Sequence, residues 1–132
     1  LLKMYKYSTL ENKLFDIHIF NFSNNTSDND FILFKKDFNI LLGNKKKFMA
    51  VFEISNIDSF NINFFYLKMN YIYSNKNLVK NYLVASAIVV SEKYLKLIEL
   101  GFIFKKPITP NILTSKYSLG IQYLIDISLK HE

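Results

Sequence analysis

Alternating apolar and polar residues predict a pair of strands at the start of the chain. In residues 14–22, Phe15, Ile17 and Ile19 alternate with Asp16 and His18. This period of two is typical of a half-buried strand. Residues 3–8 have a similar character, and a short polar turn near residues 11–13 separates the two segments. We therefore expect the chain to begin with a β-hairpin.

Later in the chain, longer apolar runs predict strands that are covered on both faces. Residues 48–54 form a nearly continuous apolar run, and residues 83–90 form the clearest one in the sequence. Such runs are typical of parallel strands buried between layers of helix. Pro107 and Pro110 bracket a tight connection that precedes a short strand at residues 111–113.

Between and after these runs, apolar residues recur at helical spacing and predict four helices. The first begins near Asp28 or Asp30 and ends at Gly43, and the second follows a polar turn at residues 55–59. Ser91 is expected to cap the third, which ends at Gly101. The predicted inner faces are Phe31, Phe34, Phe38, Leu41 and Leu42, then Ile62, Phe65, Tyr66, Met69, Ile72 and Tyr73, then Leu95 and Ile98, and finally Tyr117, Ile121, Leu124 and Ile125.

The predicted order of elements is β-β-α-β-α-β-α-β-α, which indicates an α/β fold. Strands that alternate with helices require right-handed crossovers, so they should lie parallel in one sheet with helices packed on it. The N-terminal hairpin would add an antiparallel edge and make the sheet mixed but mostly parallel. No Pro- or Gly-rich linker divides the chain, so residues 1–132 are expected to form a single domain.

With this order of elements, the sequence resembles a STAS domain, the fold of bacterial anti-sigma-factor antagonists and of sulfate-transporter tails. The resemblance covers roughly residues 5–127. Residues 52–57 stand where the family has its aspartate-leucine-serine strand end, and residues 86–91 match the next core strand. Residues 102–112 and 117–124 resemble the third helix, last strand and final helix. The closest likeness is to divergent STAS-like or lipid-exchange-like proteins of AT-rich protists, organelles and large DNA viruses.

The resemblance implies a phosphorylatable serine at the start of the helix after the second core strand. Counting forward from residues 52–55 puts that position at residues 61–63, where this chain has no serine. Ser59 lies two residues earlier and is the nearest phosphoacceptor candidate. The other interpretation is that Asp58, Ser59 or Asn61 caps the helix by accepting hydrogen bonds from its free N–H groups.

Composition removes several kinds of chemistry. The chain has no Cys, which excludes disulfides, thiolate metal sites and thiol nucleophiles. It has no Arg, which excludes an arginine finger and a bidentate fork for phosphate or guanine. With only Gly43, Gly101 and Gly120, neither a P-loop nor a dinucleotide fingerprint can be formed. We therefore expect no cofactor and no metal.

The ionisable residues give no catalytic constellation. His18 and His131 are far apart in sequence and show no metal-ligand spacing. The carboxylate pair Asp28 and Asp30 suits a helix N-terminus through the helix dipole. We therefore predict a non-enzymatic protein with no catalytic residues.

The positive charge comes from lysine alone. The formal net charge is +6, and the lysines cluster in short runs. Lys, Asn, Ile, Phe and Tyr fill more than half of the chain and all have AT-rich codons, so mutational pressure on the gene can explain the missing Arg. The predicted phosphate or anion contacts are Lys35, Lys36, Lys45, Lys46 and Lys47. The alternative is a solvated basic face that keeps an apolar protein soluble.

Several apolar residues do not fit the predicted core faces, which suggests a contact surface for a partner protein. Those selected are Phe60, Phe64, Tyr71, Phe102, Phe104 and Ile108. The leading prediction is a non-enzymatic protein-interaction module, a structural or adaptor subunit of a larger assembly. The alternatives are an RNA- or DNA-binding subunit of organellar ribosomal type, which uses the lysines on phosphates, and a domain that binds lipid beneath the second or third helix.

The sequence also bears on the setting of the protein. No apolar run approaches the roughly 20 residues that a membrane-spanning helix needs. The first residues do not resemble a signal peptide. Composition and resemblance together suggest an intracellular, organellar (mitochondrial) or viral context.

Overall fold

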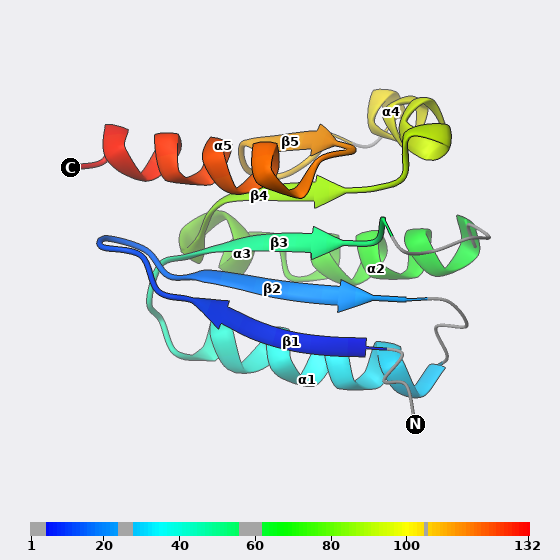
Figure 1. Ribbon diagram of the computed structural model, residues 1–132. Helices are drawn as coiled ribbons and strands as arrows, with labels where there is room; N and C mark the ends of the chain where they lie inside the picture. The colour runs from blue at the N-terminus through cyan, green and yellow to red at the C-terminus, as the bar shows by residue number, and fades with distance from the viewer. Residues whose placement is uncertain (1–4, 24–27, 56–61, 105) are drawn as a thin grey trace.

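The computed structural model describes residues 5–23, 28–55, 62–104 and 106–132. In this part of the chain, five strands form one sheet and five α-helices pack on it (Figure 1). The strands are β1 (Tyr5–Leu10), β2 (Ile17–Phe22), β3 (Phe48–Glu53), β4 (Leu83–Val89) and β5 (Asn111–Thr114). The helices are α1 (Asp28–Gly43), α2 (Ile62–Ser74), α3 (Lys76–Tyr82), α4 (Leu95–Phe104) and α5 (Tyr117–Lys130), and a 3₁₀ turn, η1 (Glu92–Tyr94), precedes α4.

The strands lie in the sheet in the same order as in the sequence, from β1 to β5. β1 pairs antiparallel with β2, with Tyr5 opposite Phe22 and Leu10 opposite Ile17. β2, β3, β4 and β5 are mutually parallel. The predicted α/β class and the mixed, mostly parallel sheet are therefore confirmed.

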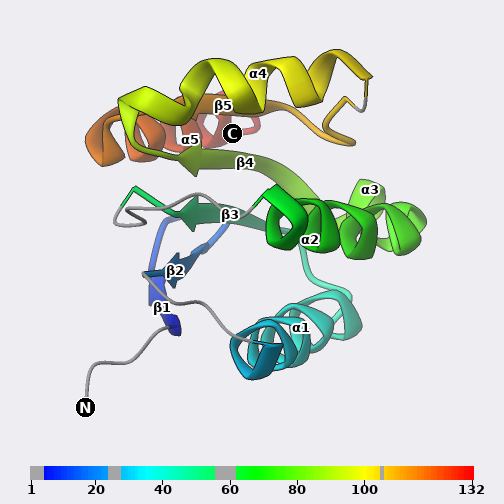
Figure 2. The ribbon, with the colours of Figure 1, turned by 90° about the vertical axis from the view of Figure 1, so that its right-hand side faces the viewer.

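The helices divide unequally between the two faces of the sheet (Figure 2). On one face, α1 lies beside α2, α3 continues from the end of α2, and α4 adds Ile98 to the same core next to β5. On the other face, α5 covers β3, β4 and β5 and buries Leu124 against Met49 and Val51. Among the described elements, α5 is the only helix on that face.

Aromatic rings dominate the core beneath α1. The rings of Phe34 and Phe38 on α1 lie 5.2 Å and 5.7 Å from the ring of Phe20 on β2, centroid to centroid. All three side chains are fully buried. Each such pair adds roughly 0.5–1.5 kcal/mol beyond the burial of apolar area. At the edge of the cluster, the Tyr5 hydroxyl donates a hydrogen bond of 2.8 Å to Oδ2 of Asp37, which ties β1 to α1.

Small residues fill the opposite interface. The buried residues of α5 are Gly120, Leu124 and Ser128. Gly120 faces Ala87 of β4, Leu124 packs in one cluster with Ala85 and Ala87, and Oγ of Ser128 accepts a hydrogen bond of 3.0 Å from the side-chain amide of Asn12 in the β1–β2 turn. A Cβ atom placed on Gly120 would lie 3.2 Å from Cβ of Ala87 and 3.3 Å from Cγ2 of Val89. Glycine at position 120 therefore allows α5 to approach the sheet closely.

Several local features differ from the prediction. The helix α4 continues to Phe104, beyond its expected end at Gly101, and Tyr66 and Tyr117, predicted to face inward, are exposed. The sequence pattern does not predict α3, because Val79 is the only residue of this short helix that is buried. Ser91 was expected to cap the helix after β4, but its side chain makes no capping hydrogen bond. That helix begins instead with the turn η1, in which the backbone N–H of Tyr94 donates to the carbonyl oxygen of Ser91.

Replacing Gly120 with valine should destabilise the protein by about 1–3 kcal/mol, because the added carbons overlap β4 and force α5 away from the sheet. Gly101→Val on α4 is the matched control, since nothing lies within 4 Å of a Cβ at that position. Urea unfolding followed by circular dichroism measures both variants. Equal unfolding midpoints for the two would contradict the close packing of α5.

Candidate binding sites

A cavity of about 60 Å³ lies between the sheet, α2 and the segment that joins α4 to β5. Its inner end is formed by Ile54, Val79 and Leu83, all of which are almost completely buried. Its outer end is formed by partly exposed residues of α4 and of the connection, among them Phe102 and Ile108. The cavity therefore has a buried apolar floor and a rim that solvent can reach.

Few polar groups border this cavity. The side-chain amide of Asn111 donates a hydrogen bond of 2.8 Å to Oγ of Ser86, so two of its polar groups bond to each other. At the rim, the hydroxyl of Tyr73 donates to the backbone carbonyl oxygen of Lys106 and links α2 to the α4–β5 connection. A pocket with this lining suits an apolar molecule that has at most a small polar part.

Lys68 of α2 contributes part of the cavity wall and is itself buried. Its Nζ atom lies 3.8 Å from the ring centroid of Phe22, which is close enough for a cation–π contact. Burial lowers the pKa of Lys68 to about 7, because a charged ammonium loses its hydration in the interior. The lysine is therefore partly neutral near physiological pH.

A second, polar cleft of about 230 Å³ lies where β2 and β3 begin. Lys13 from the β1–β2 turn and Lys46 and Lys47 from the α1–β3 turn line it, with His18 and Asp16 between them. Lys13 also lies 3.8 Å from a carboxylate oxygen of Glu132, which offsets part of its charge. The cleft is thus basic, although it contains a carboxylate.

His18 is held in place by β1. Its Nδ1 atom shares a hydrogen bond of 2.6 Å with the hydroxyl of Tyr7, and the two rings stack. Burial lowers the pKa of His18, with Asp16 acting in the opposite direction and Lys46 in the same one. A neutral imidazole at pH 7 serves here as a hydrogen-bonding group.

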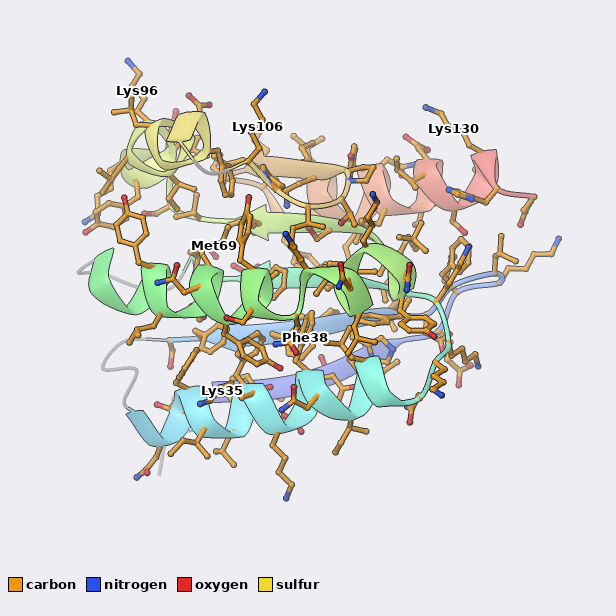
Figure 3. All side chains as sticks on the ribbon, turned by 180° about the vertical axis from the view of Figure 1, so that it is seen from behind. Lys35, Phe38, Met69, Lys96, Lys106 and Lys130 are labelled. Atoms are coloured by element: carbon orange, nitrogen blue, oxygen red, sulfur yellow. The ribbon has the colours of Figure 1, made fainter. Side chains whose placement is uncertain are left out.

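The lysines predicted as anion contacts do not form one surface. Lys45, Lys46 and Lys47 are exposed in the turn after α1. Lys35 lies on α1 on the side of α2, with its Nζ atom 4.9 Å from the ring centroid of Phe31 (Figure 3). Lys36 is exposed as well, but α1 rises roughly 10 Å from Lys36 to its last residue, Gly43. Lys36 is therefore separated along the helix from the turn that carries the other lysines. Lys46 and Lys47 therefore belong to the polar cleft, and the α1 lysines stand apart from it.

Of the predicted partner residues, the structure describes the side chains of Tyr71, Phe102 and Ile108, and all three are partly buried. Tyr71 packs against the aromatic core, and its hydroxyl donates to Oδ1 of Asn39. Phe102 and Ile108 are partly buried at the rim of the cavity. Phe60 and Ser59 lie outside the described residues, as do the side chains of Phe64 and Phe104.

Two further observations apply to the described residues alone. No three His, Asp or Glu side chains there come together in a way that could hold a metal ion. None of the helices described is both long enough and apolar enough to cross a membrane.

Lys68→Met should change how stability depends on pH. Between about pH 7 and pH 10, the folded state has released a proton that the unfolded lysine, with its ordinary pKa of 10.5, still holds. Stability of the wild-type protein should therefore rise with pH by about 1.4 kcal/mol per pH unit at most in this window. The Lys68→Met variant should lose this rise and be more stable at pH 7. Urea midpoints across the window measure the effect.

The control for this experiment is Lys80→Met, which changes an exposed lysine on α3. It should keep the wild-type rise. The window ends at pH 10 because burial also raises the pKa of Tyr71 to about 12. Above pH 10, unfolded tyrosines release protons that the folded state retains, so stability falls again. A wild-type midpoint that does not change between pH 7 and pH 10 would contradict the burial of a titrating Lys68.

Comparison with known proteins gives no indication of function. No protein family, no curated protein and no solved structure matches the chain.

Proposed function

We propose that this protein is a non-enzymatic binding domain of STAS-like architecture whose cavity holds an apolar molecule such as a lipid acyl chain. The cavity beside α2 and α3 is the observation that supports this function. An empty apolar cavity costs roughly 24 cal/mol per Å³, which is about 1.4 kcal/mol for about 60 Å³. A ligand that fills the space regains this energy and adds contacts of its own.

The placement of the surplus aromatic residues favours a small apolar ligand over a protein partner. Phe102 and Ile108 line the rim of the cavity, and Tyr71 packs against the core. Their apolar surface is therefore directed largely inward. A space of about 60 Å³ admits only the end of an acyl chain, which is narrow and flexible, while the rest of the chain and its polar head group stay outside the rim.

The order of the elements supports the STAS-like part of the proposal. Residues 52–55 stand at the end of β3, and residues 86–91 lie in and just after β4, its parallel neighbour. This arrangement is what the resemblance implies for the two segments. The helix α3 and the turn η1 depart from the expected order.

A larger side chain at Met69 should block the cavity. Met69 lies on α2 and lines the cavity, so Met69→Trp should reduce binding of a fluorescent fatty acid at least tenfold. It should also remove any lipid that native mass spectrometry detects on the purified wild-type chain. Leu67→Trp is the matched control, because Leu67 is on the same helix and 49% exposed.

The two tryptophan variants must first show the same helical circular dichroism as the wild type. Fatty-acid affinity that is unchanged in Met69→Trp would then contradict the cavity as the binding site. Absence of both bound lipid and fatty-acid affinity in the wild type would contradict the proposed function itself.

A second candidate function is binding of nucleic acid through the polar cleft. It is favoured by Lys46 and Lys47, which line the cleft from a turn where Lys45 is also exposed. Lysines bind phosphates mainly by releasing condensed counterions, so they give affinity without sequence specificity. Base stacking would contribute little, because the aromatic rings described above are largely in the core.

Exchanging Lys45, Lys46 and Lys47 together for alanine tests this candidate. If each lysine contacts one phosphate, the slope of the logarithm of the association constant against the logarithm of the salt concentration should become shallower by about 2–3 for duplex nucleic acid. Fluorescence anisotropy with a labelled oligonucleotide measures the association constant at each salt concentration. Changing Lys76, Lys80 and Lys130 to alanine removes the same charge at exposed positions elsewhere and serves as the control. Equal salt slopes for the two triple variants would exclude the cleft as the contact.

A further inference from the structure

The outward side of α4 is apolar and exposed. Leu97 is 40% exposed and Leu100 is 55% exposed, while Ile98 on the inward side is buried in the core. At 100° per residue, Leu97 and Leu100 lie within about 60° of each other on the helix surface. The outer face of α4 therefore presents two adjacent leucines to solvent, although exposed helix faces are normally polar.

Lysines flank this apolar face. Lys96 on α4 and Lys106 in the α4–β5 connection project from the same edge of the molecule (Figure 3), and Lys93 of η1 directly precedes α4. These three side chains are exposed. Glu92 and Glu99 are exposed beside them, so the face carries a small excess of positive charge. Lys130 lies at the far end of α5 and does not belong to this face (Figure 3).

The same elements form the rim of the cavity. Phe102 belongs to α4, and Pro107 and Ile108 belong to the connection that follows it. Leu97 and Leu100 thus lie on the outside of the helix whose inner side borders the cavity. A lipid that leaves a bilayer at this face would meet the cavity without crossing the rest of the protein.

We propose that α4 and the α4–β5 connection dock on the surface of an anionic lipid bilayer, with the leucines in the apolar layer and the lysines at the head groups. Peripheral proteins commonly combine these two interactions, because neither alone holds them firmly at a membrane. The excess of lysine over glutamate around α4 and the net charge of +6 favour acidic head groups over neutral ones. This inference rests on the proposed function for the cavity but concerns a different surface.

Vesicle co-sedimentation tests the docking. The wild-type chain should pellet with vesicles that contain phosphatidylglycerol, should remain in solution with phosphatidylcholine alone, and should be released by added salt. The Leu97→Glu and Leu100→Glu double variant should bind the anionic vesicles at least tenfold more weakly. Ile32→Glu with Ile40→Glu is the matched control, because these α1 residues are 57% and 54% exposed and lie away from α4.

A second pair of variants tests the lysines independently of the leucines. Lys96→Ala with Lys106→Ala should weaken binding several-fold and reduce its dependence on salt, whereas Lys36→Ala with Lys45→Ala should bind as the wild type does. Equal binding by the α4 and α1 glutamate variants would overturn the proposal. So would wild-type self-association that the α4 glutamates abolish without any vesicle binding, since it would assign the face to a second copy of the chain.

The docking surface and the cavity can fail separately. If the α4 glutamate variant loses vesicle binding but retains fatty-acid affinity, both ideas stand. If the wild-type chain binds fatty acid but no anionic vesicle, the docking surface is wrong and the cavity remains. If it docks through Leu97 and Leu100 but takes up no lipid, the proposed function is wrong and the docking surface remains.

Discussion

The contact on which this fold depends most is the packing of aromatic rings between α1, α2 and the middle of the sheet. Phe38 on α1 lies within 6.3 Å of Phe52 on β3 and 6.1 Å of Tyr71 on α2, centroid to centroid, and it also meets Phe20 on β2. One side chain thus joins two helices and two strands. Truncation of such a buried ring typically costs about 3–5 kcal/mol. The position of α2, and with it the wall of the cavity, follows from this cluster.

The two faces of the sheet are packed by different means, and the difference explains where the cavity lies. Beneath α1 and α2, large rings hold the helices away from the strands. Beneath α5, Gly120 and Ala87 bring the helix close to the sheet. The cavity forms on the aromatic face, at the side of α2 that Phe38 does not reach, next to Val79 and Phe102.

Much of this architecture could be predicted from the sequence, but the interior surfaces could not. Phe34, Phe38 and Leu42 carry a strong periodic signal, and all three are buried as expected. Gly120 and Ser128 carry no hydrophobic signal although both are buried on the inner side of α5. Hydrophobic periodicity marks which face of a helix is buried but not how closely that face approaches its neighbour. For the same reason, the sequence could not show that Phe102 and Ile108 surround a cavity.

The neighbour-to-neighbour order of the strands also bears on how the fold is built. Every strand pairs with the one that precedes or follows it in the chain, so no pairing joins the two ends of the sequence. The longest crossover between paired strands runs from Glu53 to Leu83 and contains two helices. Each parallel pairing still spans a helical crossover, so closing it costs more loop entropy than the β1–β2 hairpin but less than a pairing between the two ends of the chain would. When the chain is synthesised from its N-terminus, each new strand can therefore pair with a neighbour that has already been made.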